Sequence, residues 1–220
     1  MLRGQAQNYK RTKKRKALWR QRTSRWGQLL KAYRKGLISD ELFEQQVKQI
    51  NGGRRNYTYD GKSHSTEREM IIHLLDQFRC GENFASEYLN RWIEVSDQAC
   101  VKGGLRVVQQ RENYHAQLLE ARLRELGGIP QCTVAAERRE KELAFYASTE
   151  AKDADKLGSI MARLKDKDLA AVLKPLTDAI GQIQEDQQSK ELLRSLIDDE
   201  MSSGKWLIDA HKMLGGAAAA

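Results

Sequence analysis

The sequence predicts an all-α protein, a helical bundle with a basic N-terminal extension. The 220-residue chain contains only 2 Pro and is rich in Leu, Ala, Glu, Gln, Lys and Arg, which favour helices. β-branched residues, which favour strands, form few clusters. Apolar residues recur at three- and four-residue spacing from residue 66 onward, the pattern of amphipathic helices. A chain of this length can form one bundle of about 150 residues plus an appendage.

Residues 1–27 form a basic arm that we expect to be flexible. The run KRTKKRKALWRQR is interleaved with Trp19 and Trp26. Residues 1–62 hold 17 Lys and Arg against 4 Asp and Glu, whereas the remainder holds 21 against 26. Residues 1–26 are therefore expected to bind nucleic acid or an acidic protein, or an anionic membrane surface. The alternative is a solvated tail, because a block of like charge cannot pack on itself.

Residues 28–50 predict two short helices around Gly36, with Ser39 capping the second helix. A Leu-rich helix, the run KGLIS, an acidic pair and Phe43 follow one another here, and this pattern resembles the short domain known as SHOCT. The resemblance implies a role in oligomerisation or ligand contact. Residues 51–65 contain several glycines and are predicted to be a linker.

The bundle itself is expected to span residues 66–214. Ser65 or Thr66 caps the first helix, and Gly127 and Gly128 end the second. The remaining boundaries are a turn near residues 103–104, a third helix from about 133, a break at 165–168, a fourth helix that Gly204 ends, a short fifth helix, and a tail at 215–220.

Ionisable residues interrupt the apolar stripes of three of these helices. Glu82 lies on the first stripe, Glu112 and His115 lie three residues apart on the second, and Glu150 lies on the third. Residues three apart on a helix share one face. Because buried carboxylates are costly unless they are paired or bound to a metal, a shared polar centre is expected.

The fourth helix offers several acidic residues. If the third and fourth helices form a hairpin around residues 165–168, the partner of Glu150 should lie near residue 184, where Glu185 and Asp186 occur. The later run DDEMSS offers Glu200, with Ser203 three positions on. No histidine follows three positions after any of these candidates.

The segments CGENFASEY and RENYHAQLLEARLRELGG resemble the first half of ferritin-like di-iron proteins, the rubrerythrin branch in particular. In that fold a Glu from one helix and a Glu-x-x-His from its hairpin partner supply half of a di-metal site inside a four-helix bundle of hairpin pairs. The second Glu-x-x-His is missing here. The implied metal ligands are Glu82, Glu112, His115, Glu150 and either Glu185 or Asp186.

The resemblance implies iron, as one ion or two, or manganese, and oxidoreductase chemistry of the ferroxidase or peroxidase kind. Tyr88 and Tyr114 flank the centre and are expected to hold carboxylates through their hydroxyls. A second hypothesis is a degenerate bundle whose acidic residues satisfy one another without metal, used as a binding or assembly module.

Other sequence features bear on the cellular compartment of the protein and on its oligomeric state. The 3 Cys lack metal-knuckle spacing and are expected to be reduced thiols. No apolar run approaches the roughly 20 residues that cross a bilayer, and no signal-peptide core follows the basic N-terminus. We therefore expect a cytoplasmic protein that forms a homo-oligomer.

Overall fold

The computed structural model describes residues 25–51, 56–164 and 168–215. Within these residues the chain is predominantly helical, which confirms the all-α prediction. It divides into two compact units: an N-terminal unit that ends at Tyr57 and includes His64–Thr66, and a helical unit that holds Thr58–Ser63 and the chain from Glu67 onward. Most of the predicted basic arm, residues 1–24, lies outside the described residues.

The N-terminal unit contains a pair of short helices, residues 25–34 and α2 (Asp40–Asn51). Gly36 lies between them with φ +66°, a left-handed conformation that suits glycine. The Tyr33 ring stacks on Phe43 with centroids 4.3 Å apart, and its hydroxyl donates to Asp40 Oδ1 at 2.8 Å. These contacts hold the two predicted helices together.

A β-hairpin, β1 (Tyr57–Tyr59) and β2 (Lys62–His64), occupies part of the segment where a linker was expected. Asp60 and Gly61 form its turn with φ values of 48° and 69°. An Asp-Gly pair with both residues in the left-handed region is typical of a tight hairpin turn. The backbone of Thr58 exchanges two hydrogen bonds of 2.8 Å with the Gln182 side-chain amide.

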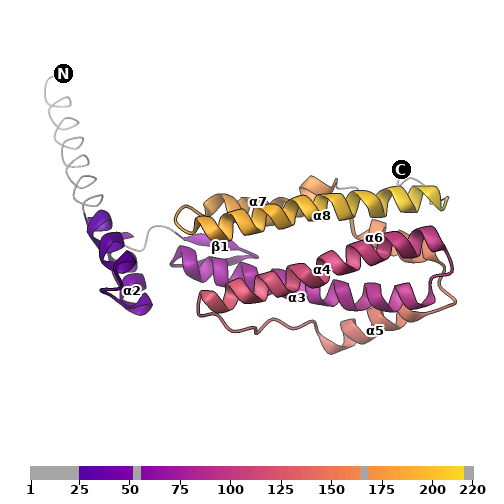
Figure 1. Cartoon of the computed structure of the whole chain (residues 1–220), viewed down its shortest axis with the longest axis horizontal. Coiled ribbons are helices and arrows are strands. Elements are labelled where there is room, and N and C mark those ends of the chain that lie inside the picture. Colours follow the sequence, from indigo (N-terminus) through magenta and orange to yellow (C-terminus); the bar gives the residue numbers. More distant parts are fainter. Residues whose placement is uncertain (1–24, 52–55, 165–167, 216–220) are drawn as a thin grey trace, which may run out of the picture. The chain divides into compact units, whose positions relative to one another are not determined.

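Three long helices, residues 67–95, 99–125 and 187–213, form the frame of the helical unit (Figure 1). The helices of this unit are α3 (Glu67–Val95), α4 (Ala99–Glu125), α5 (Ala136–Ala147), α6 (Asp153–Leu164), α7 (Leu169–Gln182) and α8 (Gln187–Met213). α4 runs antiparallel to α3 and packs along it, while α5 packs on α3 and α8 contacts α4, α6 and α7.

Contacts at successive heights fix the register of α4 against α8. Near one end of the pair, Arg122 donates to both carboxylate oxygens of Asp186 at 2.9 Å. Near the other end, a Cβ placed on Gly104 would lie 1.9 Å from the Trp206 ring, so only glycine permits this approach. Gly104 therefore lies inside α4, and the predicted turn forms earlier, at residues 96–98.

Apolar layers lie on both sides of the middle of α3. Met70, Ile71, Leu74 and Leu75 are buried toward its N-terminal end. Beyond the middle, a second layer consists of Leu89, Trp92, Val101, Leu105, Val108, Tyr146, Leu157 and Ala210. Burial of these two layers supplies the main stabilisation of the unit, and it places the residues between them in an enclosed environment.

The third and fourth predicted helices are each interrupted. Ser148 Oγ accepts hydrogen bonds from the backbone N–H groups of Glu150 and Ala151, which separates α5 from α6. Residues 183–186 separate α7 from α8. Gly204 does not end the helix: it lies inside α8, where a Cβ would lie 2.7 Å from the Leu169 side chain.

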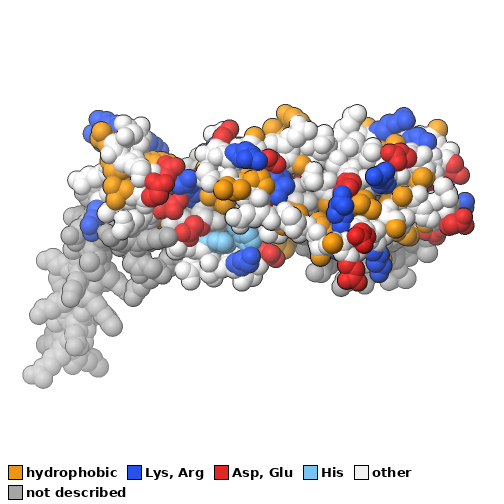
Figure 2. Space-filling view, turned by 90° about the horizontal axis from the view of Figure 1, so that it is seen from below, with side chains coloured by type: hydrophobic (Ala, Val, Ile, Leu, Met, Phe, Trp, Pro, Cys, Tyr) orange, Lys and Arg blue, Asp and Glu red, His pale blue; other side chains and the backbone are white. Residues whose placement is uncertain are grey.

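The surface of the helical unit carries charges of both signs. On the face shown in Figure 2, acidic and basic side chains are interspersed along the helices, and neither sign forms a continuous patch. In the part of the chain that is described, no helix combines the length and the hydrophobicity required to cross a membrane.

Candidate metal centre

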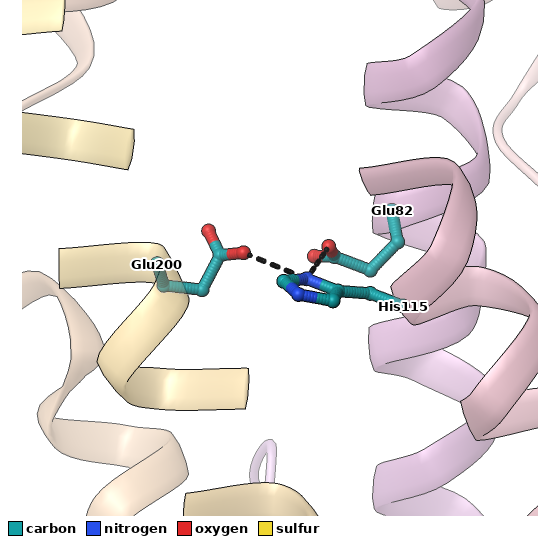
Figure 3. A group of neighbouring side chains, drawn as sticks. All are labelled: Glu82, His115 and Glu200. Atoms are coloured by element: carbon teal, nitrogen blue, oxygen red, sulfur yellow. Dashed lines mark hydrogen bonds and ion pairs between the residues drawn. The ribbon is translucent and has the colours of Figure 1, made fainter. Parts of the chain in front are cut away.

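Between the two apolar layers lies a group of ionisable side chains that we call the polar centre. It consists of Glu82 from α3, Glu112 and His115 from α4, and Asp199 and Glu200 from α8. The exposed fractions of Glu82, Glu112 and His115 are 5%, 6% and 1%. Figure 3 shows Glu82 and His115 reaching toward Glu200 from the facing helices.

Helical spacing explains why these side chains point inward. Glu82 follows the buried Phe78 by four residues and precedes the buried Leu89 by seven. Glu200 lies on the buried stripe of α8, four residues after Leu196 and three before Ser203. The apolar packing that forms the bundle therefore drives these carboxylates into the interior together with their neighbours.

The imidazole of His115 is the centre of the arrangement. Its Nδ1 lies 3.1 Å from Glu82 Oε2 and 3.2 Å from Glu200 Oε1, and its Nε2 lies 3.2 Å from Asp199 Oδ2. An ionised carboxylate only accepts hydrogen bonds, so the contact with Asp199 is a hydrogen bond when Nε2 carries the proton. In the neutral imidazole, Nδ1 then presents a lone pair to two carboxylate oxygens from different helices.

The oxygen of Glu200 nearest to His115 is buried and has no hydrogen-bond partner. A protonated Nδ1 has a single N–H, and it forms its hydrogen bond with Glu82. Buried polar atoms without a partner are uncommon and costly. The polar centre thus has more acceptors than the imidazole can satisfy.

Electrostatics in the polar centre favour retention of protons. Burial raises the pKa of Glu82 well above its usual range, and the nearby charge of Glu200 raises it further. Burial likewise raises the pKa of Glu112, with added repulsion from Glu82 and Glu200. Burial alone would lower the pKa of His115, but the adjacent carboxylates of Glu200 and Asp199 outweigh that effect and raise it.

Glu82 and Glu112 share a side-chain hydrogen bond, which two carboxyl groups can form only with a proton between them. Repulsion among neighbouring carboxylates is relieved either by such protons or by a cation. Both effects favour the protonated forms of Glu82 and Glu112, and a cation at this place would compete with those protons.

The ligand geometry suits a cation. One ligand atom each from Glu82, His115 and Glu200 lies within 4.8 Å of the others. Adjacent ligands in an octahedral complex with bonds of about 2.1 Å are about 3.0 Å apart, close to the Nδ1 distances of 3.1 and 3.2 Å. Glu112, hydrogen-bonded to Glu82, can supply a further oxygen.

Comparisons with protein-family models, with curated proteins and with solved structures find no match. The ferritin-like resemblance therefore stays a prediction from the sequence.

The structure brings Glu82, Glu112 and His115 together but places the other predicted ligands elsewhere. Glu150 is exposed between α5 and α6. Glu185 is exposed in the segment between α7 and α8. Asp186 caps the N-terminus of α8 through Ser189 and binds Arg122, whose guanidinium helps to keep the pKa of Asp186 low despite burial.

These predicted ligands lie elsewhere because two breaks, between α5 and α6 and between α7 and α8, interrupt the predicted helices. In the predicted hairpin both helices run unbroken from residues 165–168, so that equal sequence distances mean equal heights. Ser148 ends α5, and Asp186 starts α8, so Glu150 and the pair Glu185 and Asp186 fall outside the helices. Glu200 of α8 lies at the height of His115 instead.

A serine bonded to Arg111 occupies the position where a second histidine would belong. Ser203 occupies the position three residues after Glu200, and it accepts a hydrogen bond from Arg111 at 3.3 Å. The guanidinium also donates to Ser202 and lies 4.0 Å from Asp199. A fixed positive charge therefore borders the polar centre on the α8 side.

The two predicted tyrosines behave differently. Tyr114 is 59% exposed and points away from the interior. Tyr88 stacks on Tyr146, and burial raises the pKa of its hydroxyl, with smaller effects from Tyr146 and Glu112. Tyr88 is thus the tyrosine placed near the carboxylates.

Asp199 is the residue of the polar centre that the sequence analysis missed. It immediately precedes Glu200, and an acidic residue beside a ligand candidate is the available signal. Its 44% exposed side chain reaches His115 Nε2 from the rim of the bundle.

Proposed function

We propose that the polar centre binds a divalent iron or manganese ion within a ferritin-like bundle, and that the protein is an oxidoreductase of the ferroxidase or peroxidase kind. The supporting observation is that His115 Nδ1 faces carboxylate oxygens of Glu82 and Glu200 at 3.1 and 3.2 Å, with one of these oxygens lacking a hydrogen-bond partner. A cation is the ligand that satisfies all three atoms at once.

The donor set favours iron or manganese over zinc. Carboxylate oxygens suit magnesium, calcium and manganese, whereas imidazole suits iron and zinc. Several carboxylates with one imidazole match a six-coordinate ion better than the tetrahedral nitrogen and sulfur sites typical of zinc. The four ionised carboxylates of the polar centre, a neutral imidazole and a divalent cation leave two negative charges, of which the adjacent Arg111 guanidinium offsets one.

The residues of the polar centre have distinct roles in this proposal. Asp199 accepts the Nε2 proton of His115 and so holds Nδ1 as the ligand atom. Glu112 and Glu82 share a proton that can leave when a cation enters or return during a reaction. A bound iron ion would supply electron transfer with dioxygen or peroxide. The apolar layers on either side exclude bulk water.

The absence of a second Glu-x-x-His favours one tightly held ion over two. Ser203 is a poor ligand beside the charged Arg111, and the positive guanidinium opposes a second cation at that place. We therefore expect one high-affinity ion per chain.

Anaerobic titration of the metal-free full-length protein with Fe(II), or with Mn(II), tests the proposal. We expect about one ion to bind per chain, with binding lost in Glu200→Gln and retained in the matched control Glu150→Gln. Fe(II) bound at the centre should then oxidise faster than free Fe(II) on addition of dioxygen or peroxide, as followed by absorbance. Equal binding by both variants would contradict the proposal.

A metal-free assembly module is the alternative function, and one observation favours it. Glu82 forms side-chain hydrogen bonds with both Glu112 and Glu200, so a protonated chain of carboxyl groups can exist without an ion. In that case neither Fe(II) nor Mn(II) would bind in the titration or change the thermal stability of the protein.

A further inference from the structure

Two cysteines, the buried Cys80 and the partly exposed Cys132, lie where the connection between α4 and α5 packs on α3. Cys80 belongs to α3, and Cys132 belongs to the segment that connects α4 to α5. Cys80 is near enough to Cys132 to contribute to the raised pKa of the Cys132 thiol. Cys132 Sγ also lies 3.3 Å from Gln77 Oε1, and Gln77 is one helical turn before Cys80 on the same face of α3.

The backbone of Cys132 is anchored to the same turn of α3. Its N–H donates to Asp76 Oδ2 at 2.7 Å, and its carbonyl accepts from Arg79 at 3.1 Å. Asp76 also accepts the N–H of Gln131 at 3.0 Å. Three polar contacts therefore hold the segment against the turn of α3 that precedes Cys80.

We propose that Cys80 and Cys132 form a specific redox modification site, which closes to an intrachain disulfide when a peroxide oxidises the protein. The proposal depends on this packing and not on the function proposed for the polar centre. Both cysteines are thiols in the structure, which is the reduced state of the site.

The reaction balances with peroxide as the oxidant. Cys132 is partly exposed, so its sulfur attacks one peroxide oxygen, the O–O bond breaks, and a sulfenic acid and one water form. The Cys80 sulfur then attacks the sulfenic sulfur, the S–O bond breaks, and the second water leaves with the thiol proton. The two cysteines lose two electrons and two protons, and the peroxide is reduced to two waters.

Local chemistry keeps the pair reduced under mild conditions. Burial raises the pKa of the Cys132 thiol to about 12, with a contribution from its contact with Cys80. The reactive thiolate is therefore scarce at neutral pH. We expect the disulfide to form slowly with weak oxidants and to depend on peroxide concentration.

Closure would fix the α4–α5 connection covalently to α3. In the reduced protein this connection is held by hydrogen bonds of Asp76 and Arg79 with the backbone of Cys132. A hydrogen bond from Arg68 to Leu126 O also holds it. The exposed Cys100, at the start of α4, provides an internal comparison because it lies outside the α4–α5 connection and outside α3.

The test is disulfide mapping of the full-length protein by mass spectrometry. The protein is freed of metals with a chelator, treated with hydrogen peroxide in native buffer, alkylated and digested without reduction. We expect a peptide that joins Cys80 to Cys132 as the major disulfide, its loss when the oxidation is carried out in urea, and its retention in Cys100→Ser.

Two results would overturn the inference. One is that Cys80 and Cys132 are both alkylated under conditions that oxidise Cys100. The other is that Cys132 accumulates as sulfinic acid while Cys80 stays free. Because wild-type protein gives these results, the test does not depend on the folding of a cysteine variant.

Discussion

Replacement of Glu112 by Gln should stabilise the metal-free protein at neutral pH while it weakens metal binding. The raised pKa of Glu112 means that the folded chain holds a proton that the unfolded chain releases. The stability linked to this proton is complete below the ordinary Glu pKa of about 4.3, and it is lost as pH rises through the folded-state pKa. Gln carries no charge and can still donate to Glu82.

The magnitude follows from linkage. Each unit by which the folded-state pKa exceeds its unfolded value costs about 1.4 kcal/mol at high pH. Removal of one buried carboxylate from a repelling group should therefore raise the free energy of unfolding by about 1–3 kcal/mol. For a chain of this size, that gain corresponds to a rise in Tm of roughly 2–12 °C.

Urea unfolding followed by circular dichroism, with chelator present, measures this effect. The gain of Glu112→Gln over wild type should be larger at pH 8 than at pH 5. With Mn(II) added the order should reverse, because an ion at 1,000 times its Kd stabilises the wild type by about 4.1 kcal/mol. Glu150→Gln, altered at an exposed site, should stay within about 0.5 kcal/mol of wild type throughout.

The reasoning would be refuted if metal-free Glu112→Gln were less stable than wild type at pH 8. That result would mean that Glu112 is fully satisfied in the folded protein, as expected of a purely structural hydrogen-bond network. An equal Mn(II)-induced gain in both proteins would also remove Glu112 from the ligand set.

Three further changes probe other parts of the molecule. Asp199→Asn should weaken Mn(II) binding 10- to 100-fold in equilibrium dialysis, because His115 loses the carboxylate that fixes its ligand nitrogen; unchanged affinity would contradict this role. Gly104→Ala should lower the free energy of unfolding by about 1–3 kcal/mol in urea, because the new Cβ clashes with the indole ring of Trp206. The matched control Gly103→Ala, where a Cβ meets nothing, should be neutral or stabilising. The reverse order of the two variants would refute this account of the packing. Deletion of residues 1–26 should abolish salt-sensitive binding to polyanions in a filter-binding assay, and binding that survives the deletion would exclude the arm.

The part of the polar centre that α3 and α4 supply could be predicted, because these two helices are long and unbroken. Glu82, Glu112 and His115 interrupt apolar stripes that continue on both sides, so their burial follows from helical periodicity alone. The antiparallel pairing of α3 with α4 then brings them to one height, with Glu82 at His115.

The α8 half could not be placed by the same argument. Its height depends on where α7 ends and α8 begins, and Glu67 helps to determine that point by accepting N–H groups of Gln184, Glu185 and Asp186. Such a contact joins residues more than a hundred positions apart and leaves no local pattern. The stripe of α8 contains Leu196, Glu200 and Ser203, so periodicity could have selected Glu200 once the start of α8 was known.

The interior glycines mislead sequence reasoning for a related reason. Gly104 and Gly204 were predicted to end helices, because glycine is a poor helix former. Here each lies where a neighbouring side chain approaches the backbone, Trp206 in one case and Leu169 in the other. The two glycines mark unusual positions in the sequence, but only the tertiary contacts with Trp206 and Leu169 show that they permit close packing and do not end a helix.

Anomalous diffraction from crystals loaded with Mn(II) tests most directly whether the polar centre holds a cation. We predict a peak about 2.1–2.3 Å from His115 Nδ1 and from one carboxylate oxygen each of Glu82 and Glu200. A map with no peak there, or with peaks confined to exposed carboxylates such as Asp209, would contradict the account.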